Sequence, residues 1–199
     1  MGASPIPLNT TSTKRADARN MTNYRRLFVH GGTYFFTVNA AHPGSTVLTD
    51  NIGILRTVMA ETQAEHPFRF DAIVILPDHL HTVMTLPPGD SNFPLIWNKI
   101  KGRFSRRLDW SGPRSRSKRI KRERGIWQRR YWEHLIRDPN DFRKHVEYCW
   151  INPVRHGLVR HVCDWPYSSF HRDVARGIAS ADFAGEIAKG EFGELAASQ

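Results

Sequence analysis

The chain has 199 residues, the length of one ordinary domain with a tail or two. Hydrophobic residues make up 40% of it, yet no apolar run reaches the roughly 18–20 residues that a membrane span needs. The N-terminus lacks the apolar stretch of a signal peptide, and two cysteines are too few for a disulfide framework or a cysteine-based zinc site. These features exclude a membrane-spanning or disulfide-stapled class and predict a cytoplasmic protein with no membrane partner.

Charge is the most informative part of the composition. Lys and Arg number 29 against 19 acids, which gives a net charge of +10. Residues 99–130 hold fourteen Lys or Arg and two acids, with Phe104, Trp110 and Trp127 interleaved. A basic surface binds polyanions through phosphate contacts, and interleaved aromatic rings can stack unpaired bases. The pattern favours single-stranded or structured nucleic acid as the partner, although a merely soluble basic protein is the alternative.

The first half of the chain predicts a strand, a helix and two further strands. Residues 1–23 are polar and without periodicity, so a disordered N-terminal arm is expected there. Aromatic and β-branched residues predict a strand over 33–40. Thr49 is the expected N-cap of a helix that ends near residue 65. Two strands over 70–76 and 79–86, joined at a Pro-Asp turn, come next.

The second half predicts a helix, a basic linker and a short strand. Ser91 or Asn92 caps a helix whose apolar face runs from residue 93 to residue 108. Residues 111–125 are rich in Ser, Arg and Lys without an apolar stripe, and they are expected to form a linker insertion. A short aromatic segment over 131–137 is the fourth predicted strand.

A last helix completes the predicted order β-α-β-β-α-β-α. Asp138 is its expected N-cap, and it should end near Ile151 because Pro153 disfavours helix at the residue before it. Residues 178–199 are expected to be a C-terminal tail. The order predicts an α+β class, a ferredoxin-like split βαβ antiparallel sheet with an added C-terminal helix. The first two helices would cover one face of the sheet and leave the other open to a ligand.

Two histidines on the third predicted strand are candidate metal ligands. Residues two apart on a strand share a face, so His79 and His81 lie side by side while Leu80 points to the opposite layer. Two neutral imidazoles at that spacing suit a divalent ion, with room left for substrate oxygens. Taken alone, the pair is weak evidence for a metal, because two hydrogen-bonded histidines that bind no metal are the commoner reason for such a pattern. A third ligand is needed to decide.

The last helix carries a second candidate pair, Tyr148 and Asn152. The two residues are four apart and therefore share one face of the helix. Tyr148 could be a nucleophile and Asn152 a carbonyl-oxygen ligand, or they could be a core residue and a helix-terminal cap. A tyrosine hydroxyl titrates near about 10 in model peptides, so it needs a nearby cation or base to attack at neutral pH.

Three segments resemble the REP-associated tyrosine transposases, relatives of the single-tyrosine insertion-sequence transposases in the HUH nuclease superfamily. They read PDHLHTVMTLPPGD, IWQRRYWEHLIRDPNDFRKHVEYCWINPVRHGLV and DWPYSSFHRDVARG. The resemblance runs over residues 24–177, which are therefore expected to form one nuclease domain. The basic linker over 111–125 looks longer and more basic than the family pattern, and it could either grip DNA or be a solvated loop.

The resemblance implies an activity and the residues that perform it. His79 and His81 would bind Mg²⁺ or Mn²⁺, Asn152 would match the third, helix-borne ligand, and the catalytic nucleophile would be Tyr148. The reaction implied is cleavage of single-stranded DNA beside a repetitive extragenic palindromic hairpin, with a 5′-phosphotyrosine intermediate and a free 3′-OH. One such site needs no second subunit, so a monomer is expected. The rival functions are a catalytically silent hairpin-binding protein and an RNA-binding regulator.

The basic residues near the first strand and around the second helix are the candidate DNA-binding set. Those near the start could read the bases that flank the hairpin, since Arg suits bidentate contacts to guanine, or they could be generic phosphate contacts. The complete set is Arg25, Arg26, His30, Lys99, Lys101, Arg103, Arg106, Arg129 and Arg130.

Overall fold

A four-stranded antiparallel sheet forms the centre of the computed structural model, which describes residues 26–110, 112–113, 115–121, 123–185 and 192. The strand order is β2-β3-β1-β4, so the central pair is β1 and β3. The strands are β1 (Thr33–Asn39), β2 (Arg69–Ile75), β3 (His79–Thr85) and β4 (Trp132–Leu135). The α+β class and the antiparallel sheet are confirmed, while the expected arm over 1–23 lies outside the described residues.

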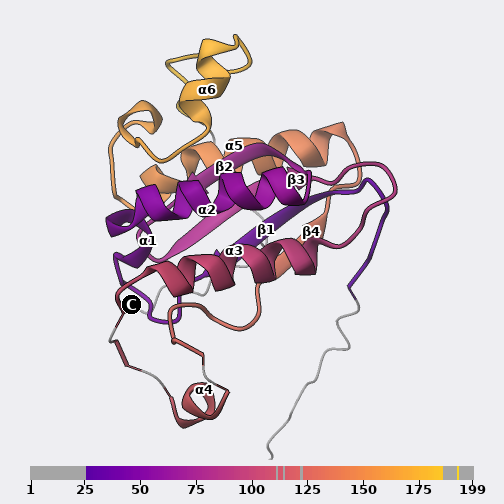
Figure 1. Cartoon of the computed structure of the whole chain (residues 1–199). Helices are drawn as coiled ribbons and strands as arrows, with labels where there is room; N and C mark the ends of the chain where they lie inside the picture. The colour runs from indigo at the N-terminus through magenta and orange to yellow at the C-terminus, as the bar shows by residue number, and fades with distance from the viewer. Residues whose placement is uncertain (1–25, 111, 114, 122, 186–191, 193–199) are drawn as a thin grey trace, which may run out of the picture.

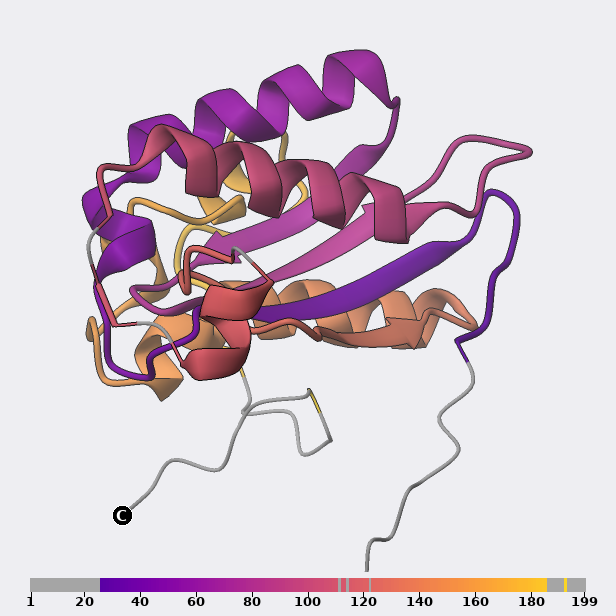
Figure 2. The ribbon, with the colours of Figure 1, turned by 60° about the horizontal axis from the view of Figure 1, so that its bottom comes forward.

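Helices cover both faces of the sheet. Helices α2 and α3 lie side by side on one face and α5 lies across the other (Figures 1 and 2). The expectation of an open second face was therefore wrong, because the added C-terminal helix covers it. The helices are α1 (Val47–Asp50), α2 (Ile52–Glu65), α3 (Phe93–Arg107), α4 (Arg116–Ile120), α5 (Pro139–Arg155), the 3-10 turn η1 (Val162–Asp164) and α6 (Phe170–Ala175). None of these described helices has the length and apolar character needed to cross a membrane.

The alternation of side chains along β1 divides the core in two. Tyr34, Phe36 and Val38 point to the layer of α2 and α3, whereas Phe35 points to the layer of α5. All four side chains are buried. A strand buried on both faces needs apolar residues at consecutive positions, which is why the aromatic run in β1 could form the centre of the sheet.

The helix expected from Thr49 begins differently. Thr49 lies inside the short helix α1, and α2 starts after Asn51, so the assignment of Thr49 as N-cap was wrong. The Asn51 side chain donates a hydrogen bond to the carbonyl of Val47 (2.9 Å), and its backbone carbonyl accepts from Leu55 N (3.0 Å). Asn51 thus ends one helix and starts the next, because its side chain competes with the backbone for these hydrogen bonds.

The segment expected as a linker contains helix α4. Its N-cap is Ser115, whose side chain accepts a hydrogen bond from Lys118 N (3.3 Å). No residue of α4 is buried, which explains why the segment shows no apolar stripe. The linker is therefore partly helical although it contributes little to the core.

Helix α5 runs four residues further than expected, through Pro153 to Arg155. Pro153 removes one backbone donor, but the following turn remains bonded, since Asn152 O accepts from His156 N (3.0 Å). Ile151, Asn152 and Pro153 are all buried in the described fold, and this packing holds the last turn in place. The prediction of an end near Ile151 was wrong because tertiary burial outweighed the local effect of proline.

We expect Asp138→Ala to lower the free energy of unfolding by about 1 kcal/mol, the usual cost of losing an N-cap. The Asp138 carboxylate accepts hydrogen bonds from the backbone N–H of Asn140 and of Asp141 (both 2.9 Å), which begin the helix that carries Tyr148. Urea denaturation measures the change. Asp138→Asn is the control, because it keeps the capping oxygen; an equal loss in both variants would show that charge rather than capping is responsible.

Candidate active site

His79 and His81 lie together on the α5 face of the sheet. Their ring centroids are 4.9 Å apart, and both side chains are buried. Leu80, between them, belongs to the core on the opposite face, as the alternation of β3 predicts. The pair is thus held on the central strand pair, where β1 supplies His81 with a cross-strand partner, Thr37.

Hydrogen bonds fix which ring nitrogen of each histidine carries the proton. The Thr37 hydroxyl donates to the Phe192 carbonyl (2.5 Å), so its oxygen accepts from His81 Nδ1–H (2.9 Å). His79 Nδ1 donates in the same way to the Asp78 carboxylate (2.7 Å). In the neutral form of each ring, which is the form that binds a metal, Nε2 therefore carries the lone pair.

The donor set fits a divalent cation. His79 Nε2 is buried and has no hydrogen-bond partner within the described part of the chain, which is the state expected of a nitrogen that binds a metal. Asp78 supplies the carboxylate that such histidines usually bond through their other nitrogen. That hydrogen bond from His79 lowers the pKa of Asp78 below its ordinary value, and a second one from Gly44 N (2.6 Å) acts in the same direction.

The register of α5 against β3 brings the helix residues to the histidines. Tyr148 lies against His81 with ring centroids 5.2 Å apart, and His156 lies against His79 at 4.9 Å. Asn152 is one turn from each of these two helix residues and is fully buried. Asn152 lies midway between Tyr148 and the C-cap His156 in sequence, so helical spacing puts it on the same side of α5 as these two histidine contacts.

Arg155 is a part of the site that sequence reasoning missed. Its guanidinium carbon lies 4.8 Å from the centroid of the Tyr148 ring. The two residues are seven apart, which is close to two full helical turns, so a helix running through Pro153 would have revealed the pairing. An exposed arginine over a buried tyrosine places a positive charge at the mouth of the site.

Phe192, in the segment expected as a tail, covers the other side of Tyr148. The two rings are stacked with centroids 3.6 Å apart and 14° between their planes. Phe192 is buried and also contacts Phe35 and His145. No periodic pattern indicates this contact, since it joins residues 44 apart in the chain and depends on the folded surface.

A second cluster, His134, Asp141 and His145, lies beside the first at the start of α5. Their potential ligand atoms lie within 4.8 Å of one another, so they could also hold a cation. In the structure they bond among themselves: His134 Nε2 lies 2.8 Å from Asp141 Oδ2, and His145 Nδ1 lies 3.1 Å from Asp141 Oδ1. Burial lowers the pKa of His145, which favours its neutral form.

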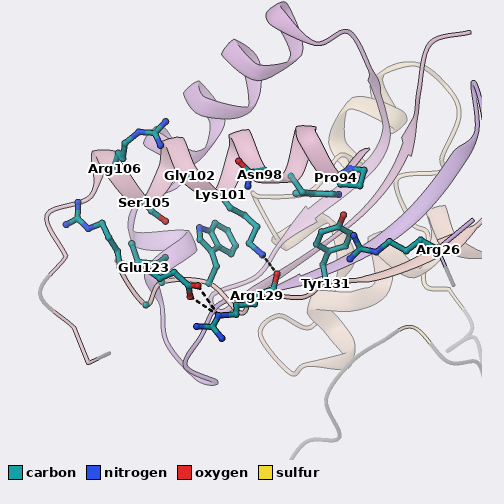
Figure 3. A pocket seen from close by; sticks show the side chains of 15 residues that line it. Arg26, Pro94, Asn98, Lys101, Gly102, Ser105, Arg106, Glu123, Arg129 and Tyr131 are labelled. Atoms are coloured by element: carbon teal, nitrogen blue, oxygen red, sulfur yellow. Dashed lines mark hydrogen bonds and ion pairs between the residues drawn. The ribbon is translucent and has the colours of Figure 1, made fainter. Parts of the chain in front are cut away.

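Four of the expected DNA-binding residues line a single cavity of about 480 Å³ between α3 and residues 123–131 (Figure 3). They are Arg26, Lys101, Arg106 and Arg129. The remaining members of the set lie elsewhere. Arg103 pairs with Glu65 on α2, His30 Nδ1 bonds to Gly89 O (2.7 Å), and Arg25 lies outside the described residues. Lys99 and Arg130 do not line the cavity.

We expect Asp78→Asn to weaken Mn²⁺ binding to the histidine pair by roughly 10- to 100-fold, the usual effect of removing such a partner. The amide no longer provides the negative charge that holds the proton on His79 Nδ1. Isothermal titration with Mn²⁺ measures the change. Asp71→Asn is a control on the same sheet, because Asp71 bonds to Thr85 far from the histidines; equal losses would assign the effect to general electrostatics.

Comparison with known proteins shows which family the chain resembles. The family model "Transposase IS200 like" matches residues 38–144. The chain is 42% identical over 174 residues to the REP-associated tyrosine transposase of Escherichia coli, covering 87% of this chain and 98% of that protein. It is 47% identical over 166 residues to a putative REP-associated tyrosine transposase of Haemophilus influenzae, covering 83% and 94%.

A solved structure described as the REP-associated tyrosine transposase bound to a REP hairpin has the same fold. Its TM-score is 0.78 at 42% identity, with 89% of this chain and 100% of that chain covered. The resemblance seen in the sequence motifs is confirmed. The chain therefore belongs to the REP-associated tyrosine transposases of the IS200-like family, enzymes that cleave and rejoin DNA.

Proposed function

We propose that this transposase is a metal-dependent single-strand DNA endonuclease and strand transferase that acts beside REP hairpins through a 5′-phosphotyrosine. Tyr148 is the proposed nucleophile, and His79, His81 and Asn152 are the proposed ligands of Mg²⁺ or Mn²⁺. One observation carries the proposal: α5 is placed so that Tyr148 contacts His81 while the next turns of the same helix face the histidine pair.

The proposed reaction exchanges one phosphodiester for another. The Tyr148 hydroxyl oxygen attacks the phosphorus, a Tyr–O–P bond forms and the P–O3′ bond breaks. The proton of the hydroxyl is transferred overall to the departing 3′-oxygen, which leaves a free 3′-OH. Attack by a 3′-OH on the phosphotyrosine reverses the step and joins DNA. A bound divalent cation supplies a Lewis acid that withdraws charge from the phosphate oxygens.

The chain's own residues arrange the reacting groups. Thr37 and Asp78 hold the two imidazoles in one orientation and one tautomer, so the Nε2 lone pairs are directed to the site before DNA binds. Arg155 lies over the Tyr148 ring, where its charge favours an anionic oxygen and an approaching phosphate. Preorganised groups of this kind stabilise developing charge without rearranging during the reaction.

The hairpin substrate is inferred from the relatives and from the charge of the chain. A relative 42% identical to this chain has been solved with a REP hairpin. The net charge of +10 and the basic residues around α3 suit the phosphates of such a partner. We assign the nine basic residues of the predicted set to DNA binding, with the cavity beside α3 as their centre.

A monomer is sufficient for this chemistry. The contact between Tyr148 and His81 lies within one chain, so the nucleophile and the proposed metal ligands do not require a second copy. The competing function, a silent hairpin-binding protein, would retain the basic surface without needing this arrangement of Tyr148, His81 and Arg155 on one site.

We expect wild-type protein incubated with Mn²⁺ and an end-labelled single-stranded hairpin to form a covalent protein–DNA adduct that survives denaturing electrophoresis. Tyr148→Phe should abolish the adduct, because the ring is kept and only the attacking oxygen is lost. His79→Ala should reduce it at least 100-fold, and chelation of the metal should do the same. Hairpin binding by Tyr148→Phe, measured separately, serves as the control for folding.

Tight hairpin binding without adduct formation in the presence of any divalent metal would support the alternative function, a catalytically silent hairpin-binding protein. An RNA hairpin of the same sequence separates the RNA-binding alternative, since the nuclease should prefer DNA. An undiminished adduct in Tyr148→Phe would assign the nucleophile to another residue and contradict the proposal.

Phe192 stacks on the Tyr148 ring, and we propose that this stack limits the access of DNA to the nucleophile. We expect Phe192→Ala to raise the rate of adduct formation by roughly two- to tenfold, the equivalent of one aromatic pair worth about 0.5–1.5 kcal/mol. Phe183→Ala is the matched control, because Phe183 packs on Trp150 and Phe170 instead of Tyr148. A rate that stays constant or falls in Phe192→Ala would show that the stack does not limit access.

A further inference from the structure

The cavity beside α3 lies on the opposite face of the sheet from Tyr148. Trp97 and Trp127, which line it, belong to the core of the α2 and α3 layer, whereas Tyr148 belongs to the core of the α5 layer. A cavity of about 480 Å³ falls within the roughly 300–1,000 Å³ of small-ligand sites. The proposed cleavage chemistry makes no use of it.

The charge of the lining selects an anion. Five of the fifteen lining residues are Lys or Arg, and Glu123 is the acid among them. Glu123 is paired with Arg129 (2.9 Å), and Arg26 is paired with Glu133 outside the lining (2.9 Å). The three remaining basic residues, Lys101, Arg106 and Arg124, therefore have no acid partner within the lining. Lys101 extends from α3 and donates to the carbonyls of Gln128 (2.6 Å) and Arg129 (3.3 Å), and Figure 3 shows the second of these bonds. Burial lowers the pKa of Lys101 to about 8, and an anion beside it would offset that effect.

Aromatic groups in the lining select a base. Arg26 lies over the Tyr131 ring, 4.7 Å from its centroid, and the two side chains form one wall of the cavity (Figure 3). Trp97 and Trp127 are 1% and 7% exposed, and neither indole N–H has an acceptor within the part of the chain that the structure describes. Together with Tyr131, these two indole rings make part of the lining aromatic, which favours a flat ring over a simple anion.

We propose that this cavity binds one unpaired nucleotide of the bound DNA strand. The base enters against the aromatic side chains of the lining, while its phosphate contacts Lys101 and the arginines of the lining. A nucleotide satisfies both requirements together, since it carries a negative charge and a flat ring. The inference rests on the proposed function only in taking hairpin DNA as the partner, and it assigns to this face a role in recognition separate from cleavage.

The test uses full-length Tyr148→Phe protein, which cannot form the adduct, and hairpin DNA with 2-aminopurine placed in turn at each unpaired position. One position should change its fluorescence on binding. An abasic site at that position should weaken binding by about tenfold, as measured by fluorescence anisotropy. Ser105→Phe, which fills the cavity from α3 without changing charge, should abolish the fluorescence change and weaken binding to intact DNA by a similar factor.

The losses of binding affinity caused by the abasic substitution and by Ser105→Phe should not be additive, because both changes remove the same contact. Lys101→Met and Lys99→Met form a matched pair, since both lysines lie on α3 but only Lys101 lines the cavity. We expect Lys101→Met to weaken binding to intact DNA more than Lys99→Met does. With abasic DNA, the two variants should weaken binding equally. Thermal unfolding followed by circular dichroism checks that each variant folds.

Three outcomes would overturn the inference: equal effects of the two lysine variants on intact DNA, wild-type binding by Ser105→Phe, or full additivity with the abasic site. Free dAMP is tested as well. If wild-type protein binds it saturably and Ser105→Phe blocks that binding without weakening hairpin binding, the cavity binds a free nucleotide and the assignment to DNA is wrong. Adduct formation by wild-type protein is measured separately. A result that contradicts nucleotide binding in the cavity therefore does not contradict the proposed cleavage reaction. Absence of both hairpin binding and adduct would instead reject the proposed function.

Discussion

The hydrogen bond between Thr37 and His81 joins the central strands of the sheet to the chemistry of the site. Thr37 on β1 lies opposite His81 on β3, and the Thr37 oxygen accepts a hydrogen bond from His81 Nδ1–H. In the neutral ring, the lone pair is therefore on Nε2. A slip of one residue in this register would move His81 to the opposite face and bring Leu80 in its place. The buried aromatic residues of β1 fix the register, and the proposed metal site therefore depends on the packing of the whole core.

Strand β4 and the residues before it connect the two faces of the molecule. Tyr131 forms a wall of the basic cavity, Glu133 pairs with Arg26 (2.9 Å), and His134 bonds to Asp141 on α5 (2.8 Å). A single short segment thus touches both the proposed nucleotide site and the helix that carries Tyr148. DNA held at the cavity and cleaved at Tyr148 would pass around this edge of the sheet, where β4 is the outer strand.

Local chemistry made much of this structure predictable. Alternation in β3 placed His79 and His81 on one face, and the Asp-Pro pair located the start of α5, because these rules depend on neighbours in sequence. The long motifs identified the family, which the comparisons confirm. The same rules misplaced the end of α5, since the local cost of Pro153 was offset by burial of that turn against the sheet. Arg155 was overlooked for the same reason.

The sequence alone determined the residue types of the site, the order of elements and the excess of positive charge. Only the tertiary structure decided which of those residues meet. The register of α5 on β3 placed Tyr148 beside His81, and Phe192 covered Tyr148. Four of the basic residues gathered around one cavity, while Arg103 was paired with Glu65. Such contacts join residues far apart in the chain, so they follow from how complete layers pack and cannot be read from any local pattern.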